Sequence, residues 1–333
     1  YAQGNPTPKL RRLDPTTDRL STREVFFARP LLVERLVTMN HAGDLLKASY
    51  AECRRVSRRS GSTFYAGFWL LPAEQRRAME ALYAFLRQTD DLADAGPSGP
   101  AACDALIAWR AALRGVLDGP SPADAKFPLS LLALADAVQR FQIPHELLFA
   151  AIDGVEMDLS GRRYDTFEQL EVYCDRVASA VGLACIHIWG FRGPEALRPA
   201  RQIGVAMQLT NILRDLNEDA AVGRVYLPLD DLRQCDYSID NLTRSVVNER
   251  FSRLMELETS RAERLYRDGA ALFDWLEPPG RRIFGLMTTT YHGLLQKIAA
   301  RPAEVFRRRV RLGRLQKARL WIRWAFCPPR KLF

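Results

Sequence analysis

The 333-residue chain lacks the features that would place it in several common classes. No apolar run approaches the roughly 18 residues that span a bilayer, and the longest, 178–191, contains His187. The six cysteines form no C-x-x-C pair, which predicts reduced thiols in a cytoplasmic protein. Period-two alternation is rare, which argues against a β-sheet. The first residues have no hydrophobic signal region, and the missing initiator Met indicates a fragment or a processed chain.

Charge is in excess of one sign and is unevenly spread. Apolar residues make up 47% of the chain, enough for a substantial core, and the net charge is +9. Arginines crowd into 301–333 together with Trp and Phe at helical spacing, a composition that suits an anionic membrane surface better than a nucleic acid. A solvated basic tail is the equally weighted alternative. We expect a flexible arm over 1–43 and a basic amphipathic tail over 313–333.

Hydrophobic periodicity predicts an all-α chain without a linker between two halves. A Pro or a Gly-rich stretch bounds several of the predicted helices, and a loop is expected over 220–228. The helices are predicted at 42–59, 73–94, 101–117, 128–141, 144–158, 166–191, 195–218, 240–275 and 280–300.

The stretch 208–219 carries the most informative pattern. In a helix, Gln208, Asn211, Asp215 and Asp219 fall on one narrow stripe, while leucines and an isoleucine occupy the other side. A second stripe upstream combines Tyr83 and Arg87 with Asp90 or Asp91 and Asp94. Like charges four residues apart repel by a few tenths of a kcal/mol, so acidic pairs on two helices call for a counter-charge such as a divalent cation.

Other interpretations of the acidic stripes were weighed. A solvated helix face is the usual explanation of a single D-x-x-x-D. A Ca²⁺ loop would need a Gly-centred twelve-residue ligand loop, and a di-iron bundle would need Glu-x-x-His pairs; neither pattern is present. Mg²⁺ held by carboxylates and completed by phosphate oxygens fits the residues best.

Residues 90–94 and 211–219 resemble the paired aspartate-rich motifs of the squalene/phytoene synthase family. The resemblance continues through 60–66, 70–83, 173–182 and 223–228, and it covers roughly 44–312. It implies a single-domain, all-α isoprenoid synthase fold with helices around a central cavity. It also implies a prenyltransferase of isoprenoid or carotenoid biosynthesis that joins two allylic prenyl diphosphates head to head.

The same resemblance implies three groups of site residues. The metal ligands, for Mg²⁺ or Mn²⁺, would be Asp90, Asp91, Asp94, Asp215 and Asp219. The catalytic and phosphate-contacting residues would be Tyr83, Arg87, Tyr173, Gln208, Asn211, Arg214, Arg224 and Tyr226. The substrate-binding residues would be Ser60, Ser62, Phe64, Val177, Ala178, Val181, Gly182, Leu183 and Tyr291, although core packing is the alternative role for each apolar member.

The implied reaction passes through a cyclopropylcarbinyl diphosphate and ends in phytoene, or in presqualene diphosphate and squalene. NADPH would be needed only for squalene, and no glycine-rich nucleotide fingerprint is present. Asp175 and Ser179 depart from the family pattern and leave product choice open, as between farnesyl and geranylgeranyl substrates. The alternatives are another prenyl-diphosphate-ionising enzyme and a non-catalytic helical scaffold. We expect no nucleic-acid partner, and a cytoplasmic location at the inner face of the membrane if the tail binds lipid.

Overall fold

A computed structural model describes residues 42–60, 63–94, 100–119 and 127–332. Residues 46–333 form one compact unit, and of residues 1–45 only the start of a helix is described. The predicted arm over 1–43 therefore lies almost wholly outside the described residues and stays a prediction. In the described part the regular elements are all helical, and the β-type pairing is one isolated bridge between Phe191 and Leu276.

The helices follow one another with short connections. They are α3 (Ala42–Arg59), α4 (Thr63–Gly67), η1 (Phe68–Leu70), α5 (Ala73–Asp94), α6 (Pro100–Leu117), α7 (Leu129–Phe141), α8 (His145–Leu159), α9 (Phe167–Cys174), the π-helical turn η2 (Asp175–Ser179), α10 (Ala180–Trp189), η3 (Pro194–Ala196), α11 (Leu197–Ala221), α12 (Leu229–Gln234), α13 (Ile239–Thr243), α14 (Glu249–Gly269), α15 (Leu272–Trp275), α16 (Pro278–Ala300), α17 (Glu304–Arg307) and α18 (Arg314–Phe326). The predicted all-α class is confirmed.

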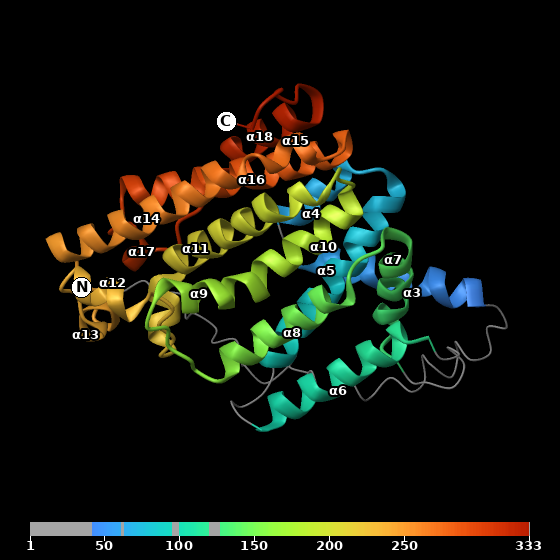
Figure 1. Cartoon of the computed structure of the whole chain (residues 1–333), viewed down its shortest axis with the longest axis horizontal. Helices are drawn as coiled ribbons and strands as arrows, with labels where there is room; N and C mark the ends of the chain where they lie inside the picture. The colour runs from blue at the N-terminus through green and yellow to red at the C-terminus, as the bar shows by residue number, and fades with distance from the viewer. Residues whose placement is uncertain (1–41, 61–62, 95–99, 120–126, 333) are drawn as a thin grey trace, which may run out of the picture. The chain divides into compact units, whose positions relative to one another are not determined.

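Helix α11 lies at the centre of the packing. It contacts α14 and α16 on one side and α9, η2 and α10 on the other, as Figure 1 shows. Leu209, Ile212, Leu213 and Leu216 are buried, so the apolar side of the predicted stripe faces the core. The polar side of the same helix is thereby directed at its neighbours α9, α16 and α17 and at the residues that follow them.

Two of the predicted helices are wrong as single α-helices. The segment 166–191 is interrupted by the π-helical turn η2, where the chain passes close to two glycines of other helices. A Cβ atom on Gly154 would lie 2.4 Å from Val177 Cγ1, and one on Gly204 would lie 2.5 Å from the Cα atom of Ser179. A π turn places one extra residue in the helix, and here it lies where α8 and α11 approach most closely.

The segment 240–275 is likewise broken. Its first helix ends at Thr243, Ser245 takes a left-handed conformation with φ of 55°, and a new helix begins at Asn248. The Asn248 side chain accepts a hydrogen bond from the Phe251 backbone N–H at 2.9 Å, which caps α14. The longer predicted helix thus separates into α13, α14 and α15.

Helix α18 is fixed to the rest of the chain by one large side chain. Trp324 is fully buried, its indole N–H donates to Thr289 Oγ1 at 3.0 Å, and its ring lies against Phe273. A Cβ atom on Gly285 would come within 2.2 Å of this ring, so the seat on α16 requires glycine. The predicted basic tail therefore contains a packed helix.

Two further expectations concern membranes and thiols. Nowhere in the described ranges is a helix both long and apolar enough to cross a bilayer. All six cysteines carry free thiols, four of them buried and two, Cys103 and Cys327, exposed, as the lack of paired motifs predicts.

Candidate active site

The polar stripe of α11 is held by a chain of charged and polar contacts. Arg214 Nε donates to Asp215 Oδ1 at 2.7 Å, and each of these side chains is only 16% exposed. Asn211 Nδ2 lies 3.2 Å from Gln208 Oε1. On the other side of the same carboxylate, Arg309 Nη2 donates to Asp215 Oδ2 at 2.9 Å. Asp215 is thus held between two guanidinium groups.

Arg309 is a residue that the sequence did not single out. It follows α17 in the loop 308–313, and its Nη1 atom lies 3.4 Å from Glu218 Oε2 of α11. In the sequence it belongs to the run 307–309, which has the composition of the basic tail. Only the fold shows that one arginine of this run turns toward the acidic stripe, so no local signal identifies it.

Asp219 lies where several negative charges meet. Its partial burial, together with the neighbouring Asp215, raises its pKa to about 6, and Arg224 acts in the opposite direction. Asp158 and Glu218 add to the upward shift. Arg224 is brought close because α11 ends at Gly223, whose φ of 77° turns the chain so that the Arg224 N–H donates to the Asp219 carbonyl at 2.9 Å. Such clustered carboxylates favour binding of a cation.

Asp158 is a second residue that sequence reasoning missed. The hydroxyls of Tyr173 and Tyr226 both donate to its carboxylate, at 3.1 and 2.8 Å. The two rings stack with centroids 5.2 Å apart, and Tyr164 lies against both. Burial, followed by the charge of Asp158, raises the pKa of Tyr173 and of Tyr226, so both hydroxyls stay protonated. The two predicted tyrosines therefore share one acceptor beside Asp219.

The α5 stripe is more exposed. Arg87 Nη2 donates to Asp91 Oδ1 at 2.5 Å. Burial opposes the charge of Arg87, but Asp91 and Asp90 outweigh it and raise its pKa. Asp90 is exposed, and Tyr83 packs edge-on against Phe68 with centroids 6.1 Å apart. The side chain of Asp94 and the whole of Ser62 lie outside the described residues, while Ser60 caps the end of α3 by donating to the Ser57 carbonyl at 2.8 Å.

The predicted metal ligands do not form a ready-made cage. Among the side chains described, no three His, Cys, Asp or Glu residues are placed so that they could hold a metal ion. Arg214 and Arg309 already neutralise Asp215, which gives a physical reason for this arrangement. The same stripe also holds a buried amide oxygen, Asn211 Oδ1, that has no hydrogen-bond partner within the described residues.

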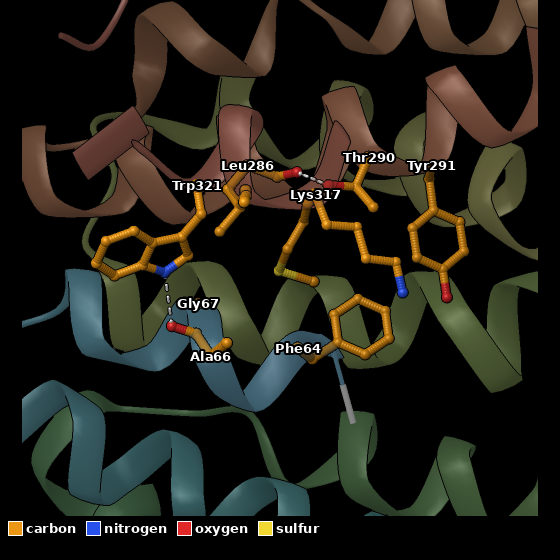
Figure 2. A pocket seen from close by; sticks show the side chains of 10 residues that line it. Phe64, Ala66, Gly67, Leu286, Thr290, Tyr291, Lys317 and Trp321 are labelled. Carbon is orange, nitrogen blue, oxygen red and sulfur yellow. Dashed lines mark hydrogen bonds between the residues drawn. The ribbon is translucent and has the colours of Figure 1, made fainter. Parts of the chain in front are cut away.

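An apolar pocket of about 270 Å³ adjoins the α11 stripe, lying between α4, α16 and α18. Figure 2 shows Phe64 and Tyr291, two predicted substrate-binding residues, at one end and Trp321 at the other. The rings of Phe64 and Tyr291 stack with centroids 5.5 Å apart. Tyr291 is hydrogen-bonded to Arg214 and Asn211, which joins the pocket to the charged stripe.

The other predicted apolar contacts lie elsewhere. Val177, Ala178, Val181 and Gly182 are partly buried, and Leu183 is buried, all along η2 and α10. None of these five residues lines the pocket beside Tyr291. Their neighbourhood on α8, α9 and α11 includes Tyr173 and Asp158, so they lie on the tyrosine side of the site.

Comparisons with known proteins agree with this architecture. The sequence model of the squalene/phytoene synthase family matches residues 57–316. The chain is 35% identical over 276 residues to a 15-cis-phytoene synthase of Synechocystis sp., covering 79% of this chain and 80% of the relative. It is 34% identical over 278 residues to the phytoene synthase of Mycobacterium tuberculosis, covering 83% and 90%.

Solved structures give the same result. Squalene synthase HpnC from Alicyclobacillus acidocaldarius superposes with a TM-score of 0.71 at 27% identity, over 78% of this chain and 95% of that one. A dehydrosqualene synthase in complex with a ligand superposes with a TM-score of 0.75 at 26% identity, over 84% and 96%. The fold and the family predicted from the two aspartate-rich motifs are confirmed. The chain belongs to the squalene/phytoene synthase family of prenyltransferases.

Proposed function

We propose that this enzyme condenses two molecules of geranylgeranyl diphosphate head to head and releases diphosphate and phytoene. The observation that carries the proposal is the joining of the Asp215–Asp219 stripe to an apolar pocket through Tyr291. A prenyl diphosphate has these same two parts, a charged head and a long apolar tail. The names of the curated relatives, which are phytoene synthases, support the choice of product.

Magnesium ions, or manganese in their place, complete the proposed site. The residues fit such an ion, because carboxylates converge on Asp219 and a buried amide oxygen of Asn211 has no partner within the described chain. Asp215 and Asp219 would hold it from α11, and Asp90, Asp91 and Asp94 from α5. Bound there, the ion would neutralise the diphosphate and favour its departure.

The arginines supply the fixed part of the charge stabilisation. When the C1–O bond of the first substrate breaks, its electron pair leaves with the diphosphate, whose negative charge increases. Arg214 and Arg309 already lie on Asp215, and Arg224 lies beside Asp219, so their N–H groups are oriented before the substrate arrives. Prearranged donors cost no reorganisation when the charge develops.

The allylic cation that remains must be kept from water. The partly buried Val177, Ala178 and Val181 offer no nucleophile, and the aromatic faces of Tyr173 and Tyr226 lie on the same side of α11. The double bond of the second substrate attacks C1 of the cation, and loss of a proton gives the cyclopropylcarbinyl diphosphate. A second ionisation, rearrangement and proton loss give phytoene without a reductant.

The proposal also includes association of the basic tail, 313–333, with a membrane, since phytoene is insoluble in water. A second candidate reaction uses farnesyl diphosphate and gives a C30 product. It draws on the structural likeness to squalene and dehydrosqualene synthases, and only the route to squalene would consume NADPH. The alternatives of a scaffold or of another prenyl-diphosphate-ionising enzyme are tested by the same incubation.

The purified enzyme should be incubated with geranylgeranyl or farnesyl diphosphate, with Mg²⁺, Mn²⁺ or a chelator, and with or without NADPH, followed by mass analysis of the lipid extract. We expect phytoene from the C20 substrate with either metal, no need for NADPH, and no product with the chelator. Asp215→Asn should abolish turnover, whereas Asp230→Asn, an exposed acid of α12, should not. A C30 product alone would move the assignment to the second candidate, and no condensation would refute both.

A further inference from the structure

Helix α18 carries large apolar side chains on the face that points away from the core. Leu315, Ile322 and Phe326 are 76%, 55% and 73% exposed. At the helical repeat they fall within roughly 40° of one another, and the fully buried Trp324 lies on the opposite side. Exposed single apolar residues are ordinary, but three on one stripe of one helix form a surface suited to a partner. These three residues are called the outer stripe below.

Cations flank the outer stripe. Arg314, Arg319 and Arg323 are exposed on the same helix, and in the described part of the chain none of the three forms an ion pair with a carboxylate. A helix that combines a stripe of Leu, Ile and Phe with neighbouring arginines matches the chemistry of a bilayer interface that contains anionic lipids. The charges would meet phosphate headgroups while the apolar side chains enter the acyl region.

The inner face of the same helix borders the candidate site. Lys317, Ala318 and Trp321 form one wall of the pocket that contains Phe64 and Tyr291. Trp321 Nε1 donates to the Ala66 carbonyl at 3.1 Å, which ties α18 to α4 across this pocket (Figure 2). A single helix therefore separates an apolar cavity beside the catalytic stripe from an apolar surface that faces outward.

We propose that the outer stripe of α18 docks the enzyme on an anionic lipid bilayer and so sets the pocket beneath it against the lipid. The proposal deepens the membrane association given above and rests on the proposed function for the nature of the molecule that leaves. A second copy of the chain is the competing occupant. A two-fold pairing through this stripe would bring Arg319 and Arg323 against their own copies, and that like-charge contact disfavours it.

Vesicle co-sedimentation tests the docking. The full chain is mixed with vesicles of phosphatidylcholine alone or with phosphatidylglycerol. We expect strong binding only to the anionic vesicles, reduced roughly a hundredfold by Leu315→Ser, Ile322→Ser and Phe326→Ser combined. Arg319→Gln with Arg323→Gln should reduce it by about tenfold or more. The matched control is Ile107→Ser with Val247→Ser, two exposed apolar side chains on other elements.

Three results would overturn the docking surface: equal binding to neutral vesicles, equal loss in the control variant, or a concentration-dependent dimer in light scattering that the triple variant abolishes. Turnover in detergent micelles keeps this test separate from that of the reaction. The triple variant should retain wild-type turnover there, with an unchanged melting temperature. A wild-type protein that binds vesicles but converts no prenyl diphosphate would sink the proposed function and leave the docking surface standing.

Discussion

Asp219 combines partial burial with close negative neighbours, so its titration reports directly on the site. Its pKa of about 6 in the folded chain lies above the ordinary value of 3.8. The folded state therefore holds the proton more tightly than the unfolded state does. The stabilising contribution is complete below about pH 4 and is lost as the pH rises through about 6.

We therefore predict that wild-type melting temperature falls between pH 4.5 and 7, and that Asp219→Asn removes this part of the fall. Adding Mg²⁺ should shift the wild-type transition to lower pH, because the metal competes with the proton. Differential scanning fluorimetry in metal-free buffers measures both effects. An unchanged pH profile in the variant would contradict the assignment of this charge cluster.

Asp158 acts on the reaction only through the two tyrosines that it holds. We predict that Asp158→Asn lowers kcat by about 10- to 100-fold, because the amide cannot accept both hydroxyl hydrogen bonds as the carboxylate does. Tyr226→Phe should lower kcat less. The double variant should be no slower than Asp158→Asn alone, since both changes break the same contact.

The matched control for Asp158 is Asp153→Asn, an acid one turn earlier on α8 that pairs with Arg110. It should leave kcat unchanged. A structural role for Asp158 would instead lower the melting temperature and leave the ratio of phytoene to early-quenched products as in the wild type. Full additivity in the double variant would show that Asp158 and Tyr226 act independently.

At this scale the sequence indicates the chemistry but not all of the partners. The spacing of Gln208, Asn211, Asp215 and Asp219 predicts their common stripe, because a helix fixes it locally. Asp158 stands alone on α8, and its link to Tyr173 and Tyr226 arises only from packing. Arg309 is 94 residues from Asp215, so no local pattern could join them.

Among the elements, the π-helical turn η2 depends on small residues opposite it. We predict that Gly204→Ala costs about 1–3 kcal/mol of unfolding free energy, because the new methyl group would meet the backbone of Ser179. Gly182→Ala is the matched control on the neighbouring helix, where the nearest atom, the Ala200 carbonyl oxygen, is 3.8 Å away. Urea unfolding compares the two, and an equal loss in both would rule out the close approach as the cause.

The helices that periodicity predicts best are those with clear boundaries. Those over 42–59 and 73–94 are found as predicted, the second because Pro72 precedes it and a Gly-Pro stretch follows. The breaks inside 166–191 and 240–275 were missed for different reasons. The π turn preserves the apolar period, whereas the cap at Asn248 was a readable signal that the long heptad-like pattern obscured.

Over the whole molecule, Trp324 connects the C-terminal helix to the main bundle. We predict that Trp324→Ala costs about 3–5 kcal/mol and releases α18, since the ring fills the space over Gly285. Trp321→Ala, a change on the same helix that removes one hydrogen bond and a partly buried ring, should cost less. Limited proteolysis and thermal melting measure both, and equal sensitivity of the two variants would contradict the anchoring role.

The Arg309 contact makes metal uptake and the ordering of loop 308–313 reciprocal. Any cation that coordinates Asp215 must displace a guanidinium whose charge cannot be titrated away, so the resting enzyme resists metal until pyrophosphate offers Arg309 another anion. Arg309→Gln should therefore bind Mn²⁺ more tightly alone yet lose the cooperativity between Mn²⁺ and inorganic pyrophosphate seen by calorimetry, whereas Arg308→Gln, paired with Glu304, should retain it. Such an ordered assembly would spare a lone prenyl chain from premature ionisation.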